Sequence, residues 1–308
     1  MTTEPGSARP LFPPVRGPPQ WVPPPPRDPP KPALIPDNSS PSADWLPIYN
    51  KRTPYVEAEI VHLIHEIVRH FVQLSPISED DVIWPPEGGH HLDEAVCNEL
   101  NISDEAKSLT RLLPCPGPKC IPQICLYEFS RIFDITEDGG LRDSRESPSC
   151  FDDTAPLAER YILPYEVQLS SGDRDTPSII LDTRENTIRI VYMMEGADDL
   201  NPPDAPLERP DNPFYYRNYW PRHAPAWLRR QLNRIKALDI IPPGPDELGY
   251  VDSSIEWLRR KIKHSLEGTY GWPDDFQQSA WDQDCERLWN EANKEFERLG
   301  SPDVLKFN

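Results

Sequence analysis

The prolines of this chain are concentrated at its amino end, and this uneven distribution most limits what the chain can fold into. Of the 40 prolines, 16 lie in residues 1–48, a stretch with few large apolar side chains. Such a segment buries too little apolar surface to offset the entropy lost on ordering, so it is predicted to be disordered or extended as polyproline II. The fold must therefore be built from the rest of the 308 residues, which is enough for a sizeable core.

The amino-terminal tail also carries a peptide motif. Residues 26–31 read Pro-Arg-Asp-Pro-Pro-Lys and fit the pattern P-x-x-P-x-[KR] through Pro26, Pro29 and Lys31. Such segments dock in the aromatic grooves of SH3 and WW domains because the polyproline helix is already formed in the free chain. Proline-rich linkers match the same pattern by chance, so the motif indicates either a docking site or a plain linker.

The chain is acidic, with a formal net charge of −19, and this charge limits its partners. It repels phosphate backbones and anionic membranes, so direct binding of nucleic acid or of a membrane is disfavoured. The expected partners are proteins, either basic ones or ones that carry an SH3 or WW domain. Solubility alone is the simpler explanation of the charge.

The sequence also bears on the compartment. No stretch approaches the ~20 apolar residues that a membrane-spanning helix needs. Residues 1–10 lack the basic and apolar regions of a secretory signal. Six cysteines in a chain of this length do not indicate a disulfide framework and are typical of a reducing compartment. We therefore expect the protein in the cytoplasm, the nucleus or both.

Apolar residues recur at helical spacing in residues 55–74 and predict an amphipathic helix. Thr53 is expected to cap its amino end, with a proline at the first helical position, and Pro76 to stop it. Two short helices follow, the second with Ser103 as its N-cap. Residues 115–154, rich in Pro, Asp and Ser, are predicted to be an irregular surface excursion.

The pattern then changes to short runs of Ile, Val, Leu and Tyr. The runs Tyr161–Ser170, Ser178–Asp182 and Thr187–Tyr192 are separated by turn-like residues and predict a three-stranded antiparallel meander. The last run alternates only partly between apolar and polar residues, so helices are expected to cover one face of the sheet.

The last third of the chain is predicted to be helical, because apolar stripes recur near residues 227–238, 255–266 and 274–300. The last of these helices is expected to begin at Asp274 as its N-cap, and Trp272 and Phe276 are expected to be structural anchors.

The predicted fold class is therefore α+β, with a small antiparallel meander packed by helices. We divide the chain into a disordered proline-rich tail at 1–50, an α+β domain at 51–200 and a helical region packed on it at 201–308.

Cysteines and histidines form the first candidate site. Cys115, Cys120 and Cys125 are separated by four residues each, and His90 and His91 lie upstream. Zinc prefers tetrahedral thiolate and imidazole ligands, so one of the histidines is a candidate fourth ligand. Zinc knuckles usually have two residues between their cysteines, and free thiols, buried or exposed, are the favoured interpretation.

Aspartates form the second candidate site. Asp173 and Asp175 lie in a predicted turn and Asp182 ends the next strand, an arrangement suited to a hard cation such as Mg²⁺ or Mn²⁺. Hairpin turns also favour aspartate for local hydrogen bonds, and this structural explanation is preferred.

Two further groups lie on predicted helices. His62, His65 and His70, with Glu66, are expected on the solvated face opposite the apolar stripe rather than around a metal. Basic runs at 229–234 and 259–263 suit a phosphate-bearing ligand, but a solvated or ion-paired face is the favoured interpretation. We therefore assign no catalytic residue, cofactor or metal from the sequence.

Part of the chain resembles a known superfamily. Residues 162–165, 178–183 and 186–190 resemble the strand core of SUKH proteins, which include fungal cell-wall-synthesis regulators and bacterial toxin-immunity proteins. Over residues 55–297 the chain is similar to a family of uncharacterised filamentous-fungal proteins. In that family a leading helix, a WPPEGG-like loop, this meander and a motif like Gly-Trp-Pro-x₂-Phe (271–276 here) occur in the same order. The resemblance implies an α+β protein-binding domain without catalysis.

Two functions remain open on the sequence. The chain has no G-x-S-x-G, P-loop or G-x-G-x-x-G motif. The favoured function is a non-enzymatic interaction or regulatory protein of unknown pathway. The alternative is a metal-dependent enzyme that uses Asp173, Asp175 and Asp182 or the Cys–His set. Convergence of those side chains in one pocket would favour the enzyme.

Overall fold

The computed structural model describes residues 53–117, 124–127, 130–148, 160–171, 176–192, 201, 205, 207–212, 215–242 and 256–299. Helices and antiparallel strands both occur there, and the α+β class is confirmed. In chain order the elements are α2 (Glu57–Leu74), η2 (Glu79–Asp81), β1 (Val82–Ile83), α3 (Glu94–Glu99), α4 (Asp104–Arg111), β2 (Cys115–Pro116), β3 (Cys125–Tyr127), β4 (Ser130–Ile132), α5 (Asp138–Asp143), β5 (Glu166–Ser171), β6 (Ser178–Asp182), β7 (Thr187–Val191), η4 (Tyr216–Asn218), β8 (Arg222–His223), α7 (Ala224–Lys236), α8 (Glu256–Gly268) and α9 (Gln278–Leu299).

The main sheet has six antiparallel strands in sequence order, β3-β4-β5-β6-β7-β8. The predicted meander is its centre, β5–β7, although β5 begins at Glu166 rather than at Tyr161. The prediction that residues 115–154 form an irregular excursion is wrong in part. Strands β3 and β4 extend the sheet, and residues such as Leu126 and Ile132 are buried in the core. These strands have three residues each, too few to show an alternating pattern in the sequence.

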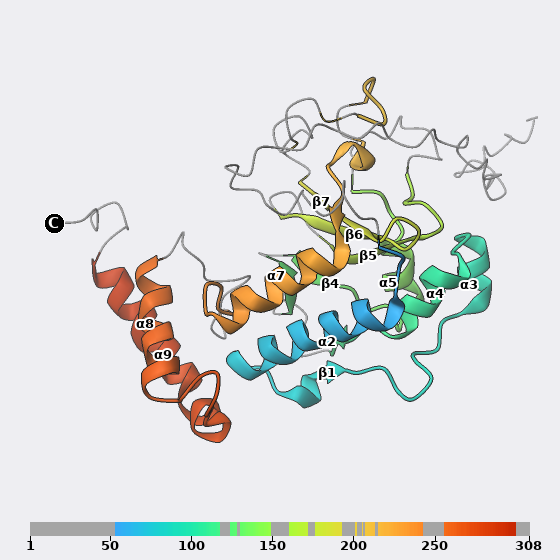
Figure 1. Cartoon of the computed structure of the whole chain (residues 1–308). Coiled ribbons are helices and arrows are strands. Elements are labelled where there is room, and N and C mark those ends of the chain that lie inside the picture. The colour runs from blue at the N-terminus through green and yellow to red at the C-terminus, as the bar shows by residue number, and fades with distance from the viewer. Residues whose placement is uncertain are drawn as a thin grey trace, which may run out of the picture.

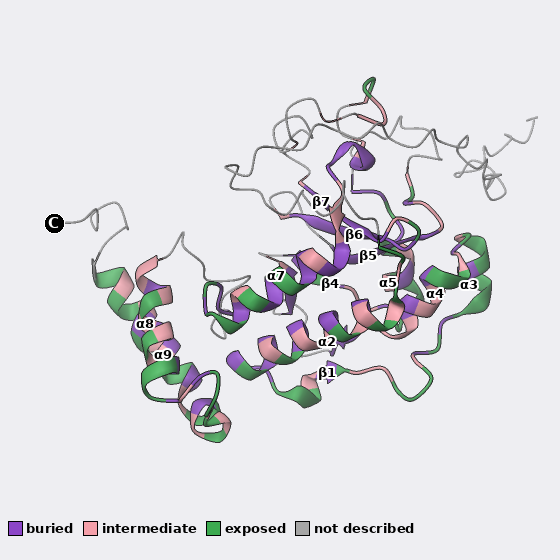
Figure 2. Ribbon diagram, viewed as in Figure 1, coloured by how far each residue is buried: buried purple, intermediate pink, exposed green. Residues whose placement is uncertain are grey.

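Side chains of the central strands alternate between two buried faces. On one face Val167, Leu181 and Ile188 belong to the main core, which α2 and α7 cover. These two helices lie side by side in front of the sheet (Figure 1). The opposite face is also buried, which Figure 2 shows as purple along β5–β7. It carries a small apolar cluster that includes Ile180 and Tyr216, and beside it a group of charged residues.

Helix α2 follows its predicted apolar stripe, and the buried residues recur from Ile60 to Leu74. The predicted N-cap is wrong. The helix begins at Glu57, and its N-cap, Val56, has no side-chain cap. The hydroxyl of Thr53 instead accepts a hydrogen bond from Asn186 at 3.2 Å and lies 2.6 Å from His223 Nε2. A tertiary contact with the sheet therefore takes the place of the expected local cap. By contrast, Ser103 caps α4 as predicted.

Helices α8 and α9 pack against each other and lie at the carboxy-terminal ends of α2 and α7 (Figure 1). The last carbonyls of a helix lack intrahelical donors and carry partial negative charge. Side chains of α8 and of the segment after it donate to carbonyls at the end of α7: Trp272 Nε1 to Lys236 O at 2.9 Å, Lys263 Nζ to Ala237 O at 2.6 Å, and Arg259 Nη1 to Leu238 O at 2.9 Å.

Two predictions concern this junction. Trp272 is buried, as a structural anchor must be, with its ring edge-on to Phe276 at 5.0 Å between centroids. The predicted N-cap at Asp274 is wrong, because α9 begins at Gln278 and Asp274 lies in the turn before it. Gly271 has φ of +75° and a backbone pressed against Asp275, so the Gly-Trp-Pro turn has no space for a side chain there.

Among the described helices, none combines the length and the apolar composition that crossing a bilayer requires.

Candidate functional site: a buried ion network

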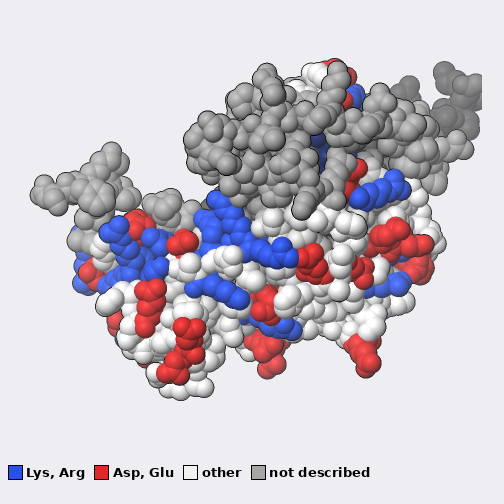
Figure 3. All heavy atoms as spheres, in the orientation of Figure 1, with Lys and Arg blue, Asp and Glu red and all other residues white. Residues whose placement is uncertain are grey.

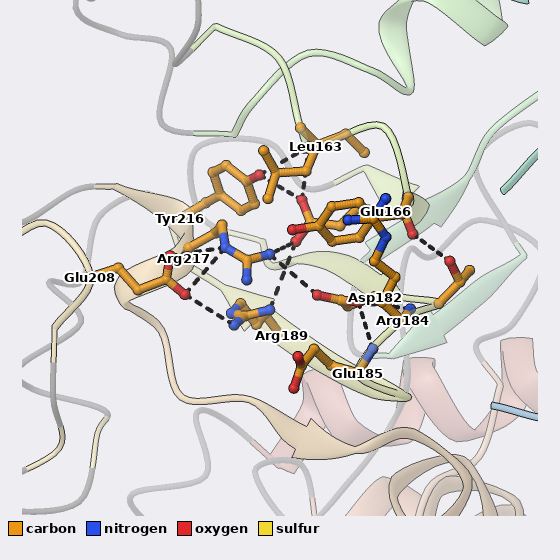
Figure 4. Close-up of polar contacts among 12 residues, drawn as sticks. Leu163, Glu166, Asp182, Arg184, Glu185, Arg189, Glu208, Tyr216 and Arg217 are labelled. Carbon is orange, nitrogen blue, oxygen red and sulfur yellow. Dashed lines mark hydrogen bonds and ion pairs between the residues drawn. The ribbon is translucent and has the colours of Figure 1, made fainter. Parts of the chain in front are cut away.

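The second face of the sheet carries a group of charged residues that the surrounding chain buries. We call this group the ion network, and Figure 4 shows most of it. Its acids are Glu166 on β5, Asp182 on β6 and Glu208. Its bases are Arg145, Arg189 on β7 and Arg217 on η4, and Tyr216 joins them through its hydroxyl. The three acids and three arginines balance in formal charge.

Glu166 lies at the centre, and both of its carboxylate oxygens are occupied. Oε2 accepts from the Tyr216 hydroxyl at 2.5 Å and from the Leu163 backbone N–H at 2.9 Å. Oε1 accepts from Nη1 of Arg217, and Nη1 of Arg189 lies 3.8 Å from it. The side chain has no exposed surface. A buried carboxylate is tolerated only with such compensation.

Asp182 is directly opposite Glu166 on the neighbouring strand. Like charges at such a position repel, and here one guanidinium lies between them. Oδ1 of Asp182 accepts from the backbone N–H groups of Arg184 at 3.0 Å and Glu185 at 2.8 Å. Oδ2 accepts from Arg217 Nη1 at 3.4 Å. The side chain of Asp182 therefore closes the β6–β7 turn and joins the network at the same time.

Arg217 and Glu208 connect the sheet to the segment that covers it. Arg217 Nε donates to both oxygens of Glu208, at 3.0 and 3.2 Å, while its Nη1 reaches the two strand carboxylates. Glu208 also lies 3.5 Å from Arg189 Nη2. Glu208 is the most exposed acid of the three, at 23% of its side chain, so it forms the rim of the network.

Arg145 binds backbone rather than carboxylate. Its Nη1 donates to the Glu166 carbonyl, and its Nη2 donates to the carbonyls of Ile162 at 3.1 Å and Leu163 at 2.7 Å. The residue is 3% exposed. Arg145 therefore fastens the chain entering β5 to the segment after α5, next to the carboxylate of Glu166.

Burial and mutual charge shift the pKa values of the network. Burial, and then the charge of Glu166, raises the pKa of Asp182 above its ordinary value. Burial raises the pKa of Tyr216 well above 10, so this hydroxyl stays a donor. Burial lowers the pKa of Arg145 to about 10. Burial opposes the charge of Arg217, but Glu166 and Glu208 together raise its pKa well above the ordinary value.

The arrangement is that of a structural clamp. All four carboxylate oxygens of Glu166 and Asp182 receive hydrogen bonds from the chain itself. A general acid or base needs an oxygen that reaches a substrate. Here the oxygens hold Arg217, Tyr216 and backbone N–H groups, and thereby fix η4 against the sheet.

The aspartate site predicted from the sequence is not assembled by the described residues. Asp182 is buried in the ion network, whereas Asp173 and Asp175 lie outside the described residues. The described part of the chain holds no group of three or more His, Cys, Asp or Glu side chains with metal-binding geometry.

One pair of the predicted zinc site does come together. Cys115 Sγ lies 3.8 Å from His90 Nε2, and both residues are buried. The ring nitrogen is also 2.9 Å from the Leu113 carbonyl, to which it donates. Burial raises the pKa of the Cys115 thiol to about 12. Cys125 is buried, His91 is exposed and Cys120 lies outside the described residues.

The helix histidines are less exposed than predicted. His62 is exposed, but His65 and His70 are half-buried. His65 Nε2 donates to the Leu112 carbonyl at 2.8 Å, and His70 Nδ1 donates to the Glu66 carbonyl at 2.8 Å. Their rings pack edge-on against Trp84 and Trp272 respectively. They connect α2 to its neighbours. The peptide motif of Pro26, Pro29 and Lys31 lies outside the described residues.

Sequence reasoning missed the ion network. Glu166 and Arg189 alternate with apolar residues along their strands, which is typical of a solvent-facing side. Their cover comes from residues some 30 to 50 positions away, such as Tyr216 and Arg217. The sequence placed Asp182 at the end of a predicted strand, but no local signal linked it to Glu166 or Arg217.

A cavity of about 20 Å³ lies in the main core. Its walls are mostly apolar and include Ile64, Phe133 and Leu169, with Arg145 among them. This volume suits about one water molecule and is too small for an organic ligand.

The chain matches no protein-family profile, no curated protein and no solved structure.

Proposed function

We propose that the protein is a non-enzymatic interaction or regulatory protein, related in fold and role to SUKH-type protein-binding domains and located in the cytoplasm, the nucleus or both. The observation that carries the proposal is the saturation of Glu166 and Asp182 by donors of the same chain. These buried ionisable groups thus hold the fold together.

The cysteines support the same proposal. A thiol acts as a nucleophile or metal ligand in its thiolate form, which a lowered pKa favours. Burial raises the pKa of both Cys115 and Cys285 to about 12. These side chains therefore serve as small apolar core residues.

The proposed docking element is the peptide motif of the amino-terminal tail. Pro26 and Pro29 would fill the aromatic grooves of an SH3 or WW domain, and Lys31 would pair with an acidic residue at the rim. In this proposal the tail binds the SH3 or WW domain, and the folded part of the chain is thereby brought close to the partner protein.

A binding experiment tests the docking role. The full chain would be titrated against a panel of isolated SH3 and WW domains, alongside a variant with Pro26, Pro29 and Lys31 all changed to Ala. The matched control changes Pro13, Pro14 and Arg16 to Ala, which likewise removes two prolines and one cation from the same tail. We expect the motif variant alone to lose binding. Equal binding by both variants would contradict the assigned motif.

Elemental analysis tests the non-enzymatic role. The alternative, a metal-dependent enzyme, requires a bound ion in protein purified without chelator. Stoichiometric zinc or manganese that disappears in Cys115→Ser or Asp173→Ala would overturn the proposal. We expect neither metal above trace level.

A further inference from the structure

Helices α7 and α8 are rich in Lys and Arg, although the chain as a whole is acidic. Acidic residues outnumber Lys and Arg by 51 to 32 over the whole chain. Helix α7 nevertheless has four cations and no acid. Helix α8 has four cations and two acids. We call these cations the basic face: Arg229, Arg230, Arg234, Lys236, Arg259, Arg260, Lys261 and Lys263.

The two helices present these cations on adjoining surface. Contacts from Arg259 and Lys263 to the end of α7 join the helices directly. In the space-filling view, Lys and Arg gather over α7 and α8, while the acidic side chains lie mostly below and to the right (Figure 3). Positive charge therefore gathers locally on α7 and α8, whereas the chain as a whole is strongly acidic.

Acids of the chain neutralise only part of the basic face. Five of the eight cations form ion pairs: Arg229 with Glu59, Arg259 and Arg260 both with Glu256, Lys261 with Glu295, and Lys263 with Glu267. Arg234 and Lys236 form no ion pair with any residue in the described part of the chain, and Arg234 donates only to Gln231 at 3.4 Å. Ion pairs between exposed side chains are weak, so an incoming carboxylate exchanges with them readily.

We propose that the basic face binds an acidic, extended segment of a partner protein. Residues four apart on a helix are about 6 Å apart along its axis. Alternate residues of an extended chain are about 6.6 Å apart and point to the same side. The distance between alternate acidic residues of such a segment is therefore close to the distance between two cations four positions apart on a helix, such as Arg230 and Arg234.

The overall charge favours a short acidic segment over a nucleic acid. A long polyanion feels the repulsion of the whole chain at −19, whereas a short segment lies within about a Debye length of the basic face, ~8 Å at physiological salt. This inference rests on the proposed protein-binding function, but it uses a different surface from the amino-terminal motif.

A titration with a defined probe tests the inference. The probe is a short fluorescein-labelled peptide in which Glu alternates with Ser, and the reference peptide has Gln in place of Glu. We expect the full chain to bind the Glu peptide alone, with an affinity that falls as salt rises. Replacing Arg234 and Lys236 by Gln should weaken binding about tenfold.

The matched control replaces Arg131 and Arg184 by Gln. Both are exposed and lie outside α7 and α8. Because each variant removes two positive charges, the control changes the net charge as much as the Arg234, Lys236 variant does. We expect its affinity to stay within about twofold of the parent. Circular dichroism and thermal unfolding would establish that both variants fold.

Three outcomes would overturn the inference: no binding at low salt, equal loss in both variants, or tighter binding of a single-stranded oligonucleotide with the same number of charges. None of these affects the SH3 and WW titration. Failure of the acidic-segment inference is thus distinguishable from failure of the tail motif.

Discussion

Glu166 and Asp182 are opposite each other on adjacent antiparallel strands, and both accept a hydrogen bond from the same Nη1 atom of Arg217. One guanidinium thus holds two buried like charges together and reaches a third acid, Glu208, through its Nε. Because Arg217 belongs to η4, this contact also fixes the covering segment on the sheet. The segment that covers the second face of the sheet is therefore held by ion pairs as well as by apolar packing.

Removal of the Arg217 guanidinium should be the most damaging single change in the network. Arg217→Met keeps much of the volume but leaves Glu166 and Asp182 buried without their shared cation. Breaking a buried ion pair from one side typically costs about 3–5 kcal/mol. We expect that loss in the free energy of unfolding, measured by urea titration.

Glu208 provides the control for this experiment. It belongs to the same network but is 23% exposed, so water compensates its loss in part. Glu208→Gln should cost about 1 kcal/mol or less. Equal costs for the two variants would show that burial does not set the energy of the network.

The two facing acids should respond differently to replacement by their amides. Asp182→Asn keeps the oxygen that accepts from the Arg184 and Glu185 N–H groups and removes a charge that burial disfavours. We expect it to change the unfolding free energy by about 1 kcal/mol or less at neutral pH. Glu166→Gln removes the main partner of Arg217 and should cost about 3–5 kcal/mol.

The raised pKa of Asp182 also fixes the sign of a pH effect. The folded state holds this proton at pH values where the unfolded chain, with a pKa near 3.8, has lost it. The contribution of Asp182 to stability is thus complete below the unfolded pKa and is lost as the pH rises through the folded pKa. The stability of the parent relative to Asp182→Asn should therefore fall from pH 4 upward. A difference that is flat with pH would contradict the assignment.

Trp272 should be the main anchor of α8 and α9. Trp272→Ala removes a buried ring and the hydrogen bond to the Lys236 carbonyl, and is expected to cost about 3–5 kcal/mol. Trp272→Phe keeps most of the packing and loses the N–H, so about 1 kcal/mol is expected. Trp257 is only half-buried and stacks on Phe296, so Trp257→Ala should cost clearly less than Trp272→Ala. The reverse order would contradict the anchor role.

The sequence predicts the elements whose information is local. The apolar stripe of α2, the cap at Ser103 and the runs of Ile, Val and Leu in β5–β7 each lie within one element. Strands β3 and β4 were missed because three residues carry no recognisable period, and because β4, with which β3 pairs, joins the sheet only through residues near Ser170. The N-cap predicted at Thr53 was wrong because its hydroxyl accepts a hydrogen bond from a distant residue, Asn186, instead of from the helix.

The candidate site was harder to predict for the same physical reason. Polar residues alternating with apolar ones in an antiparallel strand are expected to face water. Whether Glu166 and Arg189 do so depends on a segment near Arg217 that returns over the sheet, and no local pattern in the strands specifies this return. The Cys115–His90 contact was within reach because both residue types were already candidates for one site.

The half-buried histidines of α2 should make the fold sensitive to mild acid. Burial lowers the pKa of both His65 and His70 below 6.5. Neighbouring cations act in the same direction, Arg69 on His65 and Lys236 on His70, whereas the backbone carbonyl acceptors and Glu66 oppose the shift. Between the folded and unfolded pKa values the unfolded chain binds more protons, so stability is complete above about pH 6.5 and falls as the pH falls.

Replacing both rings by Gln tests this prediction. A Gln amide is still able to donate to the carbonyls of Leu112 and Glu66 but does not titrate in this range. We expect the loss of unfolding free energy between pH 7.5 and pH 5.5 to be smaller in the His65→Gln, His70→Gln variant than in the parent. His91→Gln, at an exposed ring, should leave the pH profile unchanged. If the double variant loses as much stability as the parent, protonation at other groups accounts for the acid sensitivity, and the two rings act only through packing and their hydrogen bonds.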